Sequence, residues 1–121
     1  MLGVGPGVHQ PRRVRDSDDL DGLVRGYPPV ENDPETTALA RDRAVAYLGE
    51  EKVVALPVAL WAEDFAYYAQ NRPACFYNLG VADAAAGIDQ PVHTPRFDID
   101  EGALVTGSGL LAWIALGMLG S

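Results

Sequence analysis

The clearest periodic pattern of apolar and polar residues lies in residues 34–48. Asp33 comes immediately before Pro34; aspartate is a preferred N-cap, and proline is favoured at the first helical position. Gly49 follows the pattern, at a place where glycine commonly ends a helix. The apolar positions are spaced as on one face of a helix: Ala38, Leu39, Val45 and Leu48. The pattern therefore predicts a helix over residues 34–48.

Two shorter apolar runs predict strands. Residues 52–56 include a β-branched pair and are closed by Pro57, and residues 74–79 form a second run. Between them, residues 62–69 have a helical pattern that is stopped by Arg72-Pro73. The order helix, strand, helix, strand, helix predicts an α/β layer. Because two strands make a poor sheet, this fold needs more strands than the pattern supplies.

The last apolar stretch, residues 101–118, predicts a helix with Asp100 as its N-cap. Residues 102–121 contain no charged side chain, and after Leu110 the helix is apolar on nearly all sides. Protein or lipid must cover such a helix. Its length is close to the roughly 20 residues that span a bilayer, but internal glycines and hydroxyl residues dilute it. We expect protein to cover it, with a small tail-anchored protein as an alternative.

Residues 1–25 lack any apolar period. Glycines open the segment, and four arginines and four aspartates follow. Such a segment cannot offset the entropy that ordering would cost, so we predict that residues 1–25 are disordered and that residues 26–121 form the folded part. Residues 26–30 (Gly-Tyr-Pro-Pro-Val) are predicted to be an extended connector, because proline fixes its own φ and biases the residue before it.

The composition limits the partners and the compartment. A chain of 121 residues forms one domain or part of one. The net charge is −8, and Lys52 is the only lysine among nine basic residues, so we expect no nucleic-acid partner. Cys75, the single cysteine, lies in an apolar run, which favours a reduced, cytoplasmic setting. No basic segment followed by an apolar core opens the chain, so no secretory signal is expected.

The densest group of chemically useful residues lies in residues 91–101. His93 stands between two prolines that restrict its loop, and imidazole is a common ligand for zinc and related metals. One histidine is not a metal site, because such a site needs three or four protein ligands. A satisfied polar loop residue is therefore the alternative interpretation. Arg96 could bind a substrate carboxylate, or it could pair with Asp98.

Glu63 and Asp64 begin the helix predicted at residues 62–69, where the positive end of the helix dipole stabilises anions. Helix capping is one explanation for these two carboxylates. The other is that they orient a metal ligand or a metal-bound water. No apolar pocket is evident around them, so neither is chosen as a general base.

Three stretches in order resemble one family. They are residues 26–34 (Gly-Tyr-Pro-Pro-Val-Glu-Asn-Asp-Pro), residues 62–68 (Ala-Glu-Asp-Phe-Ala-Tyr-Tyr) and residues 93–97 (His-Thr-Pro-Arg-Phe) followed by Asp100-Glu101. Over residues 26–121 the chain is similar to the C-terminal part of bacterial N-acyl-amino-acid amidohydrolases. This branch of the aminoacylase and carboxypeptidase metallopeptidases includes hippurate hydrolase and the plant auxin-conjugate hydrolases.

The resemblance implies an α/β fold: part of a metallopeptidase-type catalytic domain with a mixed sheet flanked by helices, with the family's lid domain absent. His93 matches the family's last metal ligand, in its H-[ST]-P-x-F motif, and Glu63-Asp64 match its A-E-D-F motif. The complete enzymes hold a pair of divalent metals (zinc, manganese, cobalt or nickel) that lowers the pKa of a bridging water. They hydrolyse N-acyl amino acids to a carboxylic acid and an amino acid.

The family's cysteine-x-histidine pair, its adjacent Glu-Glu pair and its other histidine precede the lid and have no counterpart here. Ala74 stands where the family usually has glycine. We therefore expect a C-terminal fragment of a metal-dependent amidohydrolase that has no catalytic residue of its own and is inactive alone. The alternative is a non-enzymatic assembly fragment that complements a separate N-terminal half. Self-association through the last helix is also expected.

Overall fold

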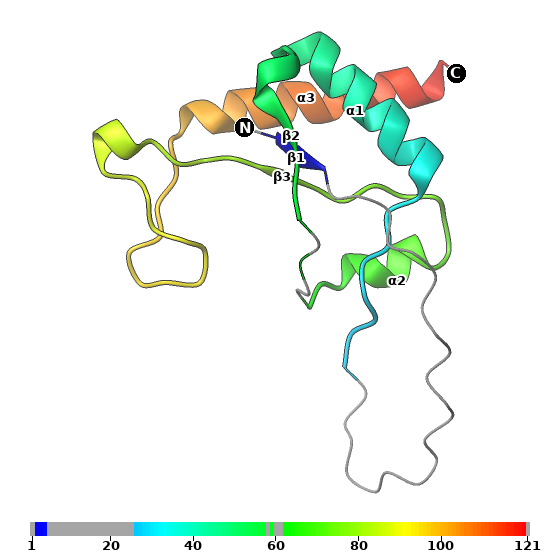
Figure 1. Cartoon of the computed structure of the whole chain (residues 1–121), viewed down its shortest axis with the longest axis horizontal. Helices are drawn as coiled ribbons and strands as arrows, with labels where there is room; N and C mark the ends of the chain where they lie inside the picture. Colours follow the sequence, from blue (N-terminus) through cyan, green and yellow to red (C-terminus); the bar gives the residue numbers. More distant parts are fainter. Residues whose placement is uncertain (1, 5–25, 58, 60–61, 121) are drawn as a thin grey trace, which may run out of the picture.

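The computed structural model describes residues 2–4, 26–57, 59 and 62–120. The regular elements, in chain order, are β1 (Leu2–Val4), α1 (Pro34–Leu48), β2 (Val53–Ala55), α2 (Phe65–Ala69), β3 (Tyr77–Leu79) and α3 (Gly102–Leu119), with short 3₁₀ turns at Glu50–Lys52 and Ala84–Ala86. Figure 1 shows α1 and α3 crossing each other on one side of the strands. The long loop between β3 and α3 extends away from them.

The three strands form a mixed sheet in the order β2-β1-β3. Strand β1 runs parallel to β2, with Leu2 opposite Val53, and antiparallel to β3, with Leu2 opposite Leu79. The mixed sheet with helices beside it confirms the predicted fold class. It also supplies the third strand that the sequence pattern lacked.

The predicted disorder of residues 1–25 is wrong for Leu2–Val4, which form the central strand β1. Pairing on both sides offsets the entropy of ordering these residues, and that gain is invisible in the local sequence. Gly3 is buried, and a Cβ added there would overlap the Leu56 side chain, so the central strand needs glycine at this position. The same prediction for residues 5–25 lies outside the described residues.

The core lies between α1, α3 and the sheet. Its buried members come from all three layers: Ala40, Ala44, Val53, Leu110 and Ile114. The predicted stripe on α1 is confirmed in part: Val45 and Leu48 pack against the core, but Ala38 is exposed, and Ala40 and Ala44 are the fully buried residues. Helix α1 contacts both α3 and the strands. Small side chains on its contact face allow both neighbours to pack closely against it.

Helix α3 is fixed against α1 by a contact between an indole and the backbone. The Trp113 indole N–H donates to the Arg43 carbonyl oxygen at 3.1 Å, and the Arg43 guanidinium lies 5.8 Å from the Trp113 ring centroid. Two glycines of α3 allow this close approach, since a Cβ at Gly109 would overlap the Tyr47 hydroxyl and one at Gly117 would overlap Arg43. The two helices therefore pack along much of their length.

The helix starts agree with the sequence for α1 and differ for α2. The Asp33 carboxylate accepts from the Thr36 backbone N–H at 2.8 Å and from the Thr36 hydroxyl at 2.6 Å, which confirms the N-cap. Helix α2 begins only at Phe65, so Glu63 and Asp64 precede it. Asp64 has helical φ and ψ and makes no side-chain cap, because an N-cap aspartate normally needs an extended backbone.

Replacing Asp33 with alanine should lower the urea midpoint of unfolding, whereas Asp33→Asn should retain most of it, because asparagine is also a good N-cap. Hydrogen bonds from Thr36 lower the pKa of Asp33 in the folded state. The charged cap therefore stabilises the fold above the ordinary aspartate pKa, and this stability is lost as the pH falls through the folded-state pKa. Urea midpoints at about pH 7 and about pH 3 should show a steeper loss for the wild type than for Asp33→Asn. Equal slopes would contradict the assignment.

Helix α3 has the length and the apolar composition of a membrane span, with a mean hydropathy of 1.7 and 17% of its residues buried. It is the one such helix among the described residues. Core helices of soluble proteins can meet the same length and composition test, so this property alone does not place α3 in a bilayer.

Candidate functional site

The loop that carries His93 is held closed at its base. The Asp100 backbone N–H donates to the Val81 carbonyl oxygen at 2.8 Å. Nearer its middle, the Asp83 and Ile88 backbones form an isolated antiparallel bridge. These bonds fix where the loop leaves and rejoins the fold, and Figure 1 shows it on the opposite side of the molecule from α2.

His93 sits in a tight turn and is exposed. The Thr94 hydroxyl donates to the Pro91 carbonyl oxygen at 2.9 Å, and the Phe97 N–H donates to the Thr94 carbonyl oxygen at 3.1 Å. His93 has a φ of 66°, and it is the single non-glycine residue of the described part with a positive φ. Histidine is among the side chains that adopt this region more readily than most. The turn therefore presents the imidazole to solvent, where it can bind a ligand.

Arg96 lies on the same turn and is exposed. Its guanidinium donates to the Gln90 side-chain oxygen at 3.5 Å, and the Asp98 carboxylate accepts from the Ile99 N–H at 2.8 Å. The arginine thus has a long contact with a neutral amide, and the aspartate is engaged with its own backbone. This arrangement leaves the guanidinium accessible to a carboxylate.

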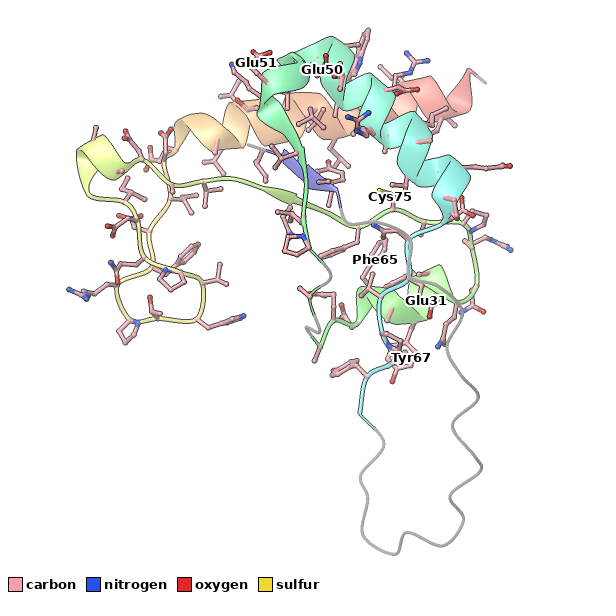
Figure 2. The ribbon with its side chains drawn as sticks, in the orientation of Figure 1. Glu31, Glu50, Glu51, Phe65, Tyr67 and Cys75 are labelled. Atoms are coloured by element: carbon pink, nitrogen blue, oxygen red, sulfur yellow. The ribbon has the colours of Figure 1, made fainter. Side chains whose placement is uncertain are left out.

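Glu63 and Asp64 come directly before α2, which Figure 1 shows on the other side of the molecule from the loop that carries His93. The Glu63 carbonyl oxygen accepts from the Ala66 N–H at 3.2 Å, and the Asp64 carbonyl oxygen accepts from the Tyr67 N–H at 3.0 Å. Both residues are thus bonded through their backbones to the first turn of α2. Figure 2 shows Phe65, Tyr67 and Glu31 gathered around α2, whereas Glu50 and Glu51 lie near the end of α1. The three labelled carboxylates therefore lie in two separate regions, Glu31 near α2 and the other two near the end of α1.

Within the described residues, no group of three or more His, Cys, Asp and Glu side chains could hold a metal ion. A catalytic zinc site needs three protein ligands and an open position. Because the described residues contribute one exposed imidazole, they do not by themselves fit the metal pair that the resemblance implies. Any such centre needs ligands from other residues.

Asn32 is a structural residue that the sequence analysis missed. Its side-chain amide donates to the Phe76 carbonyl oxygen at 2.9 Å and accepts from the Phe76 N–H at 2.7 Å. Next to it, the Asp33 N–H donates to the Ala74 carbonyl oxygen at 2.9 Å. These bonds join the segment just before α1 to the segment that leads into β3, and Asn32 and Phe76 are 44 residues apart in the sequence. The local signal was an asparagine just before a helix cap, which sequence alone reads as part of the cap.

Asn32→Ala should destabilise the chain by about 1–3 kcal/mol, because it leaves a half-buried N–H and carbonyl without partners. Asn71→Ala is the matched control, since the Asn71 amide makes one exposed, local bond to the Tyr67 carbonyl oxygen. The control should change the stability by no more than about 0.5 kcal/mol. Urea unfolding followed by circular dichroism measures both, and equal losses would refute the bridging role of Asn32.

Cys75 lies beside α1 and is half-buried (Figure 2). It is not in a strand, because β3 begins at Tyr77, three residues later than the start of the predicted run. Burial raises the pKa of the Cys75 thiol, and Thr37 acts in the opposite direction. A thiol that is held protonated is a poor nucleophile, so Cys75 serves packing next to the core.

A sequence profile of the family described as Peptidase family M20/M25/M40 matches residues 4–116. Because this match covers more than half of the chain, the chain belongs to this peptidase family. The match includes residues 4–25, which the sequence analysis placed outside the resemblance.

Three curated relatives share part of this chain. A probable hydrolase of Synechocystis sp. is 35% identical over 92 residues, which cover 75% of this chain and 23% of that protein. The IAA-amino acid hydrolase ILR1-like 6 of Arabidopsis thaliana is 34% identical over 89 residues, covering 74% and 19%. A Rhodococcus jostii protein named as a glutamate–cysteine ligase is 37% identical over 84 residues, covering 69% and 10%. The chain thus spans less than a quarter of each relative.

A solved structure has a similar arrangement. The crystal structure of an aminohydrolase from methicillin-resistant Staphylococcus aureus matches with a TM-score of 0.52 and 32% sequence identity. The match covers 75% of this chain and 22% of that one. The fold described above therefore corresponds to a part of a larger aminohydrolase chain.

Proposed function

We propose that this chain is the C-terminal part of a metal-dependent amidohydrolase that cleaves N-acyl amino acids in the cytoplasm. The observation that carries the proposal is the exposed His93 on a restricted turn inside the matched family segment. The name of the Arabidopsis relative, a hydrolase of IAA-amino acid conjugates, supports the substrate class. The ligase name comes from a protein of which this chain matches one tenth, so it does not favour a ligase reaction.

The four candidate residues have different roles in the proposed complete domain. His93 is one ligand of a divalent metal pair (zinc, manganese, cobalt or nickel), and the other ligands come from the rest of the domain. Such a centre supplies a water of lowered pKa. Arg96, close to His93 on the same turn, binds the carboxylate of the substrate through charge-assisted hydrogen bonds. Glu63 and Asp64 orient a metal ligand or a water in the complete domain.

The isolated chain is proposed to be inactive, because the described residues hold one ligand and no group placed as a general base. Activity therefore has to be tested in a complete domain. A suitable protein is a chimera in which this chain replaces the matched 22% of the Staphylococcus aureus aminohydrolase. The substrates are N-acetyl, N-benzoyl and indole-3-acetyl amino acids, and the measured product is the free amino acid.

The proposal expects the folded chimera to release amino acid and to lose this activity when a chelator removes its metal. Addition of zinc, manganese, cobalt or nickel should restore it. A chimera that folds by circular dichroism, binds metal and releases no amino acid from any of these substrates would overturn the proposed activity. Hydrolysis that persists without metal would overturn its metal dependence.

A further inference from the structure

Helix α2 is held by a group of packed side chains separate from the main core. Ala66 is fully buried, yet it is not a member of the core between α1, α3 and the sheet. Aromatic residues on and beside α2 contact one another ring to ring, and they are called here the α2 aromatic cluster: Tyr27, Phe65, Tyr67, Tyr68 and Phe76. Domains commonly have small satellite clusters of this kind beside one main core. The position of α2 therefore depends on this cluster.

Two ring contacts hold α2 from opposite sides. The Phe65 and Phe76 ring centroids are 5.2 Å apart, and the Tyr27 and Tyr67 ring centroids are 5.8 Å apart. Residues two positions apart on a helix point about 200° apart, and Figure 2 shows Phe65 and Tyr67 on opposite sides of α2. Aromatic pairs at these distances stabilise the segments that carry them. Helix α2 is thus held between the segment that leads into β3 and the connector at residues 26–30.

Asn32 fixes the position of Phe76, one of the residues that hold α2. The Asn32 side chain accepts from the Phe76 N–H at 2.7 Å and donates to the Phe76 carbonyl oxygen at 2.9 Å. Both bonds are to the backbone of Phe76, so they fix the chain at the point from which the ring reaches Phe65. A shift of this backbone would therefore shift the ring against which α2 packs.

Glu63 and Asp64 take their position from α2. Their backbones are bonded to the first turn of the helix, and the Asp64 side chain makes no cap of its own. Phe65, the residue that packs on the Phe76 ring, comes directly after Asp64. The direction in which the two carboxylates point therefore follows the place where α2 is held.

We propose that Asn32 is a positioning residue for Glu63 and Asp64. It acts through two aromatic rings, because it holds the Phe76 backbone and the Phe76 ring packs on Phe65 at the start of α2. This inference rests on the proposed function, in which the two carboxylates orient a metal ligand or a water. Their orientation is kept only while this series of contacts is intact.

The first measurement is made on the full chain in solution and needs no activity. Asn32→Ala removes both bonds to Phe76, whereas Phe76→Leu keeps these backbone bonds and removes the ring. NMR relaxation should show that each variant lowers the backbone order parameters of Glu63 and Asp64 from about 0.85, typical of rigid backbone, to below about 0.6. Leu110→Ala is the control, because it weakens the main core and leaves the α2 aromatic cluster intact.

The second measurement is made on the active chimera. Phe76→Leu should lower kcat by about tenfold or more, because small misplacements of positioned groups are costly to the reaction. In a background that carries Glu63→Gln and Asp64→Asn, the same substitution should cost no further kcat, because the groups that it displaces are already absent. Leu110→Ala should leave the kcat of the folded chimera unchanged.

Three results would overturn the positioning role. The first is high order parameters at Glu63 and Asp64 in both variants. The second is an equal fall in the Leu110→Ala control, since the loss of order would then reflect general destabilisation. The third is an equal loss of kcat in the two backgrounds, since Phe76 would then act on the reaction by another route.

The two proposals can fail separately. A chimera that folds, binds metal and releases no amino acid would refute the proposed function. Low order parameters in Asn32→Ala and Phe76→Leu would still support the positioning of α2 in that case. An active chimera together with unchanged order parameters would refute the positioning role and leave the proposed function intact.

Discussion

Replacing Leu110 with alanine is expected to destabilise the chain by about 3 kcal/mol, within the range of about 2–5 for buried leucines. Among the described residues, Leu110 is the largest fully buried side chain, and it packs with Ala40 and Ala44 of α1 and with Val53 of β2. Neither alanine on α1 can fill the cavity, so the lost contacts are not recovered. The difference in unfolding free energy from urea titrations measures the effect.

The neighbouring residue is the matched control. Leu111 is 59% exposed, so Leu111→Ala should change the stability by about 0.5 kcal/mol or less. The two variants delete the same atoms from adjacent positions of one helix. If they lost equal stability, α3 would not be packed on α1 through Leu110, and the core described here would be incorrect.

Substituting His93 with alanine in the active chimera should lower kcat/KM by about a hundredfold or more, because even residues that only support metal ligands cost about 10–100-fold. The metal content should fall with the activity if His93 is the metal ligand that we propose. The stability should change little, because His93 is exposed and its imidazole is not part of the core. Activity, metal content and urea midpoint are all measured on one preparation.

His93→Asn serves as the backbone control, because asparagine also tolerates a positive φ. Both variants should lose activity to a similar extent if the imidazole is the functional group. Recovery of activity in His93→Asn would show that the turn geometry matters and that the metal-ligand role is wrong.

Much of the fold could be predicted where the signal is local. Asp33 and Pro34 define the start of α1 by cap chemistry, and that start is confirmed. Strand β1 could not be predicted, because Leu2–Val4 become a strand only by pairing with β2 and β3, which follow far along the chain. The buried face of α1 was predicted only in part. Val45 and Leu48 pack against the core as expected, but the burial of Ala40 and Ala44 depends on contacts with α3 and the strands.

The candidate site could be predicted only in part. Composition and spacing singled out His93 and Arg96 as a polar group on one loop, and the structure places both on one exposed turn. The two roles proposed for Arg96 came from its own chemistry. The role of His93 as the last metal ligand came from the resemblance to a family, because none of the described residues forms a metal-ligand group with His93. The bridging role of Asn32 depends on a partner 44 residues away, which no local pattern reveals.

The most direct test of this account is a zinc titration of the purified chain by isothermal calorimetry, with the metal content measured after dialysis. The account predicts no stoichiometric tight binding, because a catalytic site needs three protein ligands and the described residues contribute one. Manganese, cobalt and nickel should behave in the same way. Binding of one or two equivalents that resists dialysis would contradict the central claim, since the chain would then hold a metal centre without the rest of the domain.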